Sequence, residues 1–247
     1  MTVTLAHIWR HPIKAHGREE LPEVRLIEGQ TMPWDRTWAI AHEGARTDGT
    51  EWAPCANFSR GAKASQLMAI ECTLDEATEA LTLTHPNCDT VTLHPERDVE
   101  QLIDWVRPLM PEERAQSNRV MRVKDRGMTD TAFASISITN MASHAAVEGK
   151  LGTPLSMQRW RSNLWLDGLE AWDEFNWIGK TLRIGEVEFN IEERITRCLA
   201  TTVNTETGER DADTLGALKS WGHQDFGIYA TVKNTGVIHA GDKAQII

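Results

Sequence analysis

Long apolar runs are absent from this sequence. None of the 247 residues belongs to a segment that approaches the roughly 18 consecutive apolar residues of a membrane-spanning helix. The first ten residues, Met1 to Arg10, also lack the basic start and apolar core of a secretory signal peptide. We therefore expect a cytoplasmic protein without a membrane partner.

Cysteine is scarce and irregularly spaced. The four cysteines are Cys55, Cys72, Cys88 and Cys198, and no two of them form a CxxC pair. Zinc ribbons and iron–sulfur clusters use closely spaced cysteines, so neither kind of site is expected. The cysteines are read as free thiols in a reducing compartment.

Several common catalytic motifs are missing as well. The sequence contains no GxGxxG, GxxxxGK, HExxH or GxSxG segment, which argues against the most frequent nucleotide-binding, zinc-protease and serine-hydrolase sites. Basic residues are outnumbered, because 26 Lys and Arg stand against 36 Asp and Glu and give a net charge of −10. Nucleic acid is therefore not expected as a partner, and an anionic ligand would need a local basic pocket.

Short strands separated by turns characterise the first hundred residues. The predicted strands cover residues 5–9, 24–28, 37–42, 67–72 and 81–84. Asp98 is placed to cap a helix that ends near Pro111. Because a polar stretch follows that helix, we predict a first domain over residues 1–110 and a second over residues 111–247.

The second half combines hairpin signals with a few helices. Helical segments are predicted at 139–149, 171–177 and 213–221, and strands or hairpins at 182–191, 228–232 and around the turn 234–236. The predicted fold class is β-rich α+β, closer to a barrel than to a doubly wound parallel sheet.

Cys198 is the first candidate for chemistry. It follows a predicted half-buried strand in which Val187, Phe189 and Ile191 alternate with polar residues. That strand would hold the thiol on a rigid element, and the adjacent Arg197 would favour the thiolate, which is a nucleophile and a soft metal ligand. The alternative is that Cys198 merely fills space in a sheet.

Other polar residues suggest a binding pocket rather than a metal site. The histidines His7, His11 and His16 have an H-x3-H-x4-H spacing, but solvated or packed histidines are the preferred interpretation. Basic residues lie at the ends of predicted strands: Lys14, Arg36, and Arg159 with Arg161. Together they would form the pocket that an anionic cofactor requires, because arginine offers a planar fork for phosphate and lysine a point charge.

Segments spread along nearly the whole chain carry a family resemblance. In the second half they are RSNLWLDGL at 161–169, WIG at 177–179, LRIG at 182–185, RC at 197–198 and TTV at 201–203. In the first half they are RHPIK at 10–14, DRTWA at 35–39 and QL at 66–67. These segments resemble the MOSC domain, the molybdenum cofactor sulfurase C-terminal domain, and the β-barrel domain that precedes it in many members. The resemblance implies a MOSC-type β-barrel with a few helices and an N-terminal β-rich subdomain.

The same resemblance implies a cofactor and a set of residues that hold it. Molybdenum cofactor is a pterin that carries a dithiolene and a phosphate, and in the branch of the amidoxime-reducing component a cysteine thiolate completes the metal coordination. Cys198 takes that position and is the expected catalytic residue and metal ligand. The expected cofactor-binding residues are Lys14, Arg36, Asp130, Thr131, Arg161, Asn163 and Arg197.

The function implied by the resemblance is reduction of small N-hydroxylated compounds. The sequence ends without the ferredoxin-like domain that some relatives append, so a separate ferredoxin- or flavin-type protein is expected to supply electrons. Sulfurases attach this domain to a pyridoxal-phosphate-dependent desulfurase, and no segment here has that size, so pyridoxal phosphate is not expected. The alternatives are a non-catalytic cofactor carrier, a persulfide carrier and a member that has lost the cofactor.

Two positions depart from the pattern of the related sequences. A small hydroxyl residue often follows the lysine and a glycine often precedes Asp-Arg, whereas this chain has Ala15 and Trp34. Ala15 removes one possible ligand contact. Trp34 is expected to reshape the rim of the pocket.

Overall fold

An eight-stranded sheet is the largest element of the computed structural model, which describes residues 2–247. The strand order is β15-β11-β12-β13-β9-β10-β1-β2, and β9 and β10 are parallel whereas the other neighbours are antiparallel. The strands are β1 (Thr4–Arg10), β2 (Glu19–Leu21), β9 (Ile136–Asn140), β10 (Leu164–Asp167), β11 (Thr181–Ile184), β12 (Val187–Thr196), β13 (Asp225–Val232) and β15 (Ala244–Ile246).

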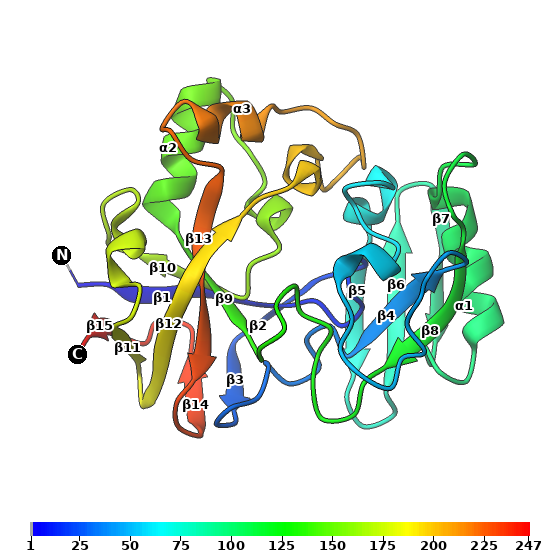
Figure 1. The fold of residues 1–247 in the computed structure, drawn as a ribbon, viewed down its shortest axis with the longest axis horizontal. Coiled ribbons are helices and arrows are strands. Elements are labelled where there is room, and N and C mark those ends of the chain that lie inside the picture. The colour runs from blue at the N-terminus through cyan, green and yellow to red at the C-terminus, as the bar shows by residue number, and fades with distance from the viewer. Residues whose placement is uncertain (1) are drawn as a thin grey trace.

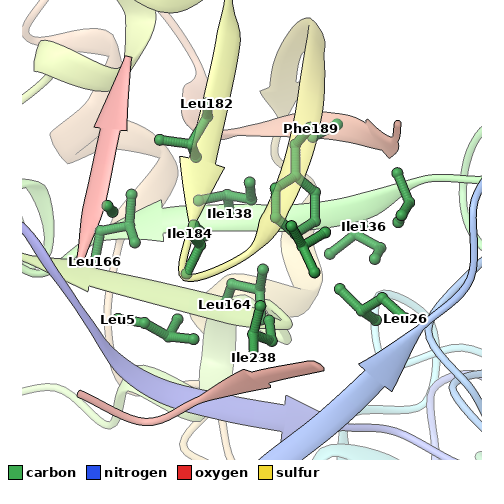
Figure 2. Packing of buried hydrophobic residues seen from close by; sticks show 14 of the residues in the cluster. Leu5, Leu26, Ile136, Ile138, Leu164, Leu166, Leu182, Ile184, Phe189 and Ile238 are labelled. Carbon is green, nitrogen blue, oxygen red and sulfur yellow. The ribbon is translucent and has the colours of Figure 1, made fainter. Parts of the chain in front are cut away.

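The concave side of this sheet encloses the main hydrophobic core. Strand β12 shows the cause, because Val187, Phe189 and Ile191 are buried while Glu188 and Asn190 between them are not. Leucine and isoleucine side chains from β1, β9, β10 and β11 gather in one cluster with Phe189 (Figure 2). Shortening Phe189 to alanine would leave a cavity and cost about 3–5 kcal/mol. A pair formed by β3 (Glu23–Leu26) and β14 (Gly236–His239) also contributes to this core.

A second group of elements lies beside the large sheet (Figure 1). It contains the pair of β4 (Trp38–His42) and β8 (Ser117–Arg122), the three-stranded sheet of β5 (Glu71–Asp75), β6 (Ala80–His85) and β7 (Cys88–Leu93), and helix α1 (Val99–Val106). Leu102, Ile103 and Val106 of α1 pack in a separate cluster with Leu81 and Leu83 of β6. This part therefore has a core of its own.

The remaining helices connect the strands around the site. They are α2 (Met141–Leu151), α3 (Thr214–Lys219) and the 3-10 segments η1 (Cys55–Asn57), η2 (Ser65–Ala69), η3 (Arg107–Leu109), η4 (Met157–Trp160), η5 (Asp173–Trp177) and η6 (Leu199–Thr202). No helix of residues 2–247 is both long and apolar enough to cross a membrane.

The β-rich α+β fold class is confirmed, but some predicted elements differ in detail. Residues 67–72, predicted as one strand, divide between η2 and β5, because Leu67 and Met68 are buried on a 3-10 turn. The helix predicted from residue 139 begins at Met141, since Asn140 accepts a hydrogen bond from the Ala142 amide as its N-cap. Asp98 stands at the N-cap of α1, but its carboxylate accepts from the His94 amide (2.8 Å) instead of capping the helix.

The predicted domain boundary at residues 110 and 111 stays a prediction. The large sheet itself contains both ends of the chain, because β1 pairs with β10 and with β2. Strands β1 and β2 of the first half therefore complete the sheet that the second half forms.

Candidate functional site

A cavity of about 440 Å³ lies where η4, η6 and β13 meet the turn after β1 and the loops around β4. Seven of the eight residues expected at the site line it: Lys14, Arg36, Asp130, Arg161, Asn163, Arg197 and Cys198. These residues come from separate segments between positions 14 and 198, so the fold brings together what the sequence separates.

Cys198 stands at the turn between β12 and η6. Its backbone is extended and forms the N-cap of η6, where the carbonyl oxygen accepts from the amide and the hydroxyl of Thr201, both at 3.1 Å. The preceding Arg197 is paired with Gln224 through its backbone amide (2.9 Å) and carbonyl (2.6 Å). The thiol is exposed, lines the cavity and forms no disulfide. A turn anchored from both sides thus presents a free thiol to the cavity.

Arg197 supports this turn and leaves one donor group unused. Its Nε donates to the Phe226 carbonyl (2.9 Å) and its Nη1 to the Trp160 carbonyl (2.7 Å), and the guanidinium lies 5.7 Å from the Trp160 ring centroid. Nη2 is buried and has no hydrogen-bond partner within residues 2–247. Burial lowers the pKa of Arg197 to about 10, so it remains a cation at neutral pH. A buried unpaired donor is costly unless a ligand accepts from it.

Lys14 and Asp130 form an ion pair on another wall. Lys14 Nζ also donates to the Met128 carbonyl (2.7 Å). Desolvation would raise the pKa of Asp130, but the charges of Lys14 and Arg36 outweigh it and lower that pKa to about 2. The Asp130 side chain is 55% exposed, so solvent in the cavity weakens the effect of burial and the cations decide the direction. Asp130 is therefore ionised at neutral pH.

Arg36 and Arg161 are linked to each other. Arg36 pairs with buried Asp35, and its Nη2 donates to the Arg161 carbonyl (2.9 Å). Burial would lower the pKa of Arg36, but the charges of Asp35 and Asp130 raise it. Arg161 donates to the Gly17 carbonyl (3.1 Å) and has no carboxylate partner within residues 2–247. Burial, with the charges of Arg36 and Arg18, lowers the pKa of Arg161 to about 9.

Several residues of this site hold backbone conformations that L-residues rarely adopt. The φ angles of Ala15, Arg36 and Arg161 are 66°, 53° and 48°. Each costs on the order of 1 kcal/mol or more and persists only because the surrounding contacts impose it. Trp34 has φ 62°, in the left-handed region that glycine adopts without strain. The expectation that Trp34 reshapes the rim is wrong, because it does not line the cavity and stacks on Trp38 at 5.9 Å.

Asn163 and Thr131 are largely engaged in the protein itself. Asn163 Oδ1 accepts from the Ser137 hydroxyl (2.8 Å) and its Nδ2 donates to the Trp9 carbonyl (3.1 Å). The Thr131 hydroxyl lies within hydrogen-bond distance of Ser135 Oγ (2.7 Å), and Thr131 does not line the cavity. Asn163 therefore shapes the wall, whereas Thr131 supports a residue that lines it.

The three histidines are packed or hydrogen-bonded within the protein. His11 and His16 are each 1% exposed. Burial is the largest cause that lowers the pKa of His11 to about 3 and that of His16 to about 4. His7 Nδ1 lies 2.6 Å from a carboxylate oxygen of Glu20. Within the described chain, the three-residue group with ligand atoms close together is Glu79, His94 and Glu96.

That group already has a cation. The Arg122 guanidinium lies 2.6 Å and 3.1 Å from oxygens of Glu79 and Glu96. One guanidinium thus offsets part of the negative charge of the two carboxylates without a metal.

Sequence reasoning missed several residues of the cavity. They are Ala62, Met68, Leu199, Ala200 and Leu215 on an apolar wall, Cys55, Arg60 and Lys63 beside it, and Ser135, Ser137, Trp160 and Tyr229. Tyr229 is the one tyrosine of the sequence, and burial, together with the charge of Asp130, raises its pKa, so it keeps its proton at neutral pH. Tyr229 lies on β13, and only the order of the strands in the sheet brings that strand to the cavity.

The balance of charge in the cavity is strongly positive. Six cationic side chains and one carboxylate line it, although the whole protein carries −10. The arrangement can hold an anionic ligand and places a soft sulfur ligand at the same site.

Comparisons with known proteins cover both parts of the chain. A model of the MOSC domain matches residues 125–245, and a model of the MOSC N-terminal beta barrel domain matches residues 2–107. Mitochondrial amidoxime-reducing component 1 of Danio rerio is 30% identical over 151 residues, which are 58% of this chain and 46% of that protein. A molybdenum cofactor sulfurase of Drosophila pseudoobscura pseudoobscura is 29% identical over 119 residues, 47% of this chain and 14% of the relative.

The chain thus spans less than half of the length of these curated relatives. Among solved structures, the YuaD protein of Bacillus subtilis superposes with a TM-score of 0.46 and 12% identity, covering 100% of this chain and 96% of that one.

Proposed function

The chain belongs to the MOSC family, and from that premise we propose that it binds molybdenum cofactor and reduces small N-hydroxylated compounds. One observation carries the proposal: a free, exposed thiol, Cys198, shares a cavity with six cationic side chains. The similarity to amidoxime-reducing components supports the same reaction class.

The residues present are chemically suited to the cofactor. A phosphate needs concentrated positive charge and N–H donors, which Lys14, Arg36 and Arg161 supply. A sulfur-rich metal centre is suited to a thiolate ligand, which Cys198 supplies without breaking any disulfide. The unpaired Nη2 of Arg197 gains a partner if an anion lies beside the thiol.

The reaction is balanced with two electrons and two protons. An amidoxime, R–C(NH2)=N–OH, takes up both and gives the amidine R–C(NH2)=NH and one water, as the N–O bond breaks. Bound molybdenum cofactor supplies the two-electron change that no side chain can perform. The electrons come from a separate ferredoxin- or flavin-type protein.

The chain itself contributes binding, charge and a hydrogen-bond donor. Lys14, Arg36 and Arg161 fix the anionic part of the cofactor, and Asp130 holds Lys14 in place through their ion pair. Tyr229 keeps its proton because burial raises its pKa, so its O–H can hydrogen-bond to the departing oxygen. Asp130 is ionised and cannot act as the acid at neutral pH.

The test compares wild type with Cys198→Ser after purification from a host that makes molybdenum cofactor. We expect near-stoichiometric molybdenum and pterin in wild type, reduction of benzamidoxime with a chemically reduced electron carrier, and loss of metal and turnover in Cys198→Ser. Cys88→Ser is the matched control, because this thiol lies on β7 and does not line the cavity. Well-folded wild type without metal and pterin would overturn the proposal.

Two other results would favour a different function for the same site. Bound cofactor without turnover by any electron donor would favour a carrier. A persulfide on Cys198 in metal-free protein would favour sulfur transfer.

A further inference from the structure

We propose that the cavity selects N-hydroxylated substrates whose apolar body carries a carboxylate, and that Arg60 binds this carboxylate. The inference rests on the proposed reductase function and names the substrate class of the same site. It rests on the residues that line the cavity but are not among the proposed cofactor-binding residues.

One part of the cavity wall is apolar and begins next to the thiol. Leu199 directly follows Cys198, is 50% exposed and lines the cavity. Ala200, Leu215 and Met68 line the cavity with it. Water interacts poorly with such a surface. Binding of an aromatic or aliphatic ligand that covers it is favoured by about 25 cal/mol for each Å² of apolar area removed from water. The wall therefore suits the apolar body of a substrate.

Arg60 is the cavity arginine with the most unused donors. Arg36 is paired with Asp35, and Arg161 and Arg197 donate to backbone carbonyls. Within residues 2–247, the one side-chain partner of the Arg60 guanidinium is the sulfur of Cys55, at 3.0 Å. A thiol is a weak acceptor, and it leaves the remaining N–H groups of the guanidinium for a carboxylate.

The segment that carries Arg60 is seated against the turn of Cys198. A Cβ atom built on Gly61 would lie 3.6 Å from the Cβ of Ala200 and 2.5 Å from the sulfur of Met68. Arg210 joins the two segments, because its Nη2 donates to the Ala62 carbonyl (3.1 Å) and its Nη1 to the Thr202 hydroxyl (2.6 Å). Cys198 and Arg60 thus line one cavity from two segments that are in contact with each other.

The charge is complementary as well. Lys63 lines the same wall, and Asp130 is the one carboxylate among the lining residues. A neutral substrate would leave Arg60 without an ionic partner, whereas a carboxylate forms the bidentate pair that arginine favours.

The experiment compares benzamidoxime with 4-carboxybenzamidoxime, which differ by one carboxylate, on the cofactor-loaded protein. We expect wild type to favour the carboxylated substrate about tenfold in kcat/KM, mostly through KM, since charge-assisted hydrogen bonds add about this much. In Arg60→Gln that ratio should fall to near one, and Arg60→Lys should recover part of it. Arg114→Gln is the control, because it removes the same charge from an exposed loop outside the cavity.

Two measurements separate this inference from the cofactor and from the proposed function. Molybdenum and pterin contents of Arg60→Gln should equal those of wild type, and their loss would assign Arg60 to the cofactor and overturn the inference. Calorimetric binding of 4-amidinobenzoate and benzamidine needs no turnover, so it tests Arg60 even if neither substrate is reduced. Equal affinities in wild type, or a preference that survives Arg60→Gln, would refute the carboxylate site.

Discussion

His11 and His16 show how single residues of this site are kept in one charge state. His11 Nδ1 donates a hydrogen bond to Asp35 Oδ1 at 3.3 Å, and its backbone amide donates to the same carboxylate. His16 Nδ1 donates to the Lys14 carbonyl at 2.7 Å, so its other nitrogen carries no proton. Both rings are buried and neutral, and they support the segments that present Lys14 and Arg36.

Acid should therefore weaken the fold well before carboxylates are protonated. The pKa values are lowered from about 6.5 in the unfolded chain to about 3 for His11 and about 4 for His16. Between these values the unfolded state binds more protons, so stability is present above pH 6.5 and is lost as the pH falls toward 4. We expect urea unfolding to show a loss of about 1.4 kcal/mol per pH unit for each histidine near pH 5.

The variant His16→Gln should lower the slope of stability against pH near pH 5 by the contribution of one histidine, about 1.4 kcal/mol per pH unit. The control variant His239→Gln changes a half-exposed histidine and should leave the slope unaltered. A wild-type stability that is constant from pH 7 to pH 5 would contradict the assignment of both rings as buried and neutral.

The loop between β8 and β9 is the element that holds the cationic wall together. The Gly127 amide donates to the Thr31 hydroxyl (2.9 Å) and the Met128 amide to the Arg36 carbonyl (2.8 Å). The Met128 carbonyl in turn accepts from Lys14. A side chain on Gly127 would collide with backbone, because its Cβ would lie 2.1 Å from the Asp35 carbonyl oxygen.

Gly127→Ala should therefore displace this loop and spread the cationic wall. We expect a loss of about 1–3 kcal/mol in the free energy of unfolding, as for other overpacked sites, and a lower pterin content of the purified protein. Urea titration and pterin release measure the two effects. Gly149→Ala is the control, since Gly149 lies in α2 with open space around its Cα and should gain up to about 1 kcal/mol. Equal stability and pterin content in Gly127→Ala and wild type would contradict this role of the loop.

At the scale of the whole molecule, the charge of the cavity opposes that of the protein. The net charge is −10, yet the cavity concentrates Lys14, Arg36, Arg60, Lys63, Arg161 and Arg197 around one carboxylate. Such a local field attracts anions in spite of the acidic exterior.

Inorganic phosphate should therefore stabilise the cofactor-free protein. At ten times its dissociation constant the stabilisation is about 1.4 kcal/mol, which raises Tm by about 3–5 °C for a chain of this length. Arg161→Gln should reduce the shift, and Asp130→Asn should enlarge it by removing the one carboxylate. Thermal unfolding in phosphate and in sodium chloride of equal ionic strength measures this, and equal shifts in both salts would contradict a specific site.

Local patterns in the sequence were sufficient for much of the fold. The alternation of Val187, Phe189 and Ile191 predicted β12, because a strand turns successive side chains to opposite faces. The prediction of one strand over residues 67–72 was wrong. A buried 3-10 turn and a buried strand show the same short apolar run in the sequence, so this pattern does not distinguish them. The short segments that carry the family resemblance led to Cys198 and the basic residues as candidates.

By itself the sequence determined the fold class, several of the strands and the candidate residues for chemistry, since these depend on side-chain type and short-range spacing, whereas strands such as β8, β9 and β10 carried no local pattern that predicted them. Only the tertiary structure decided which of them meet. Lys14 reaches the Met128 carbonyl across 114 positions and Arg36 the Arg161 carbonyl across 125. The same packing adds Arg60 and Tyr229 to the residues that line the cavity, whereas Trp34 and Thr131 are not among them. Such long-range pairings are set by sheet order and by the burial of two separate cores, which no local pattern encodes.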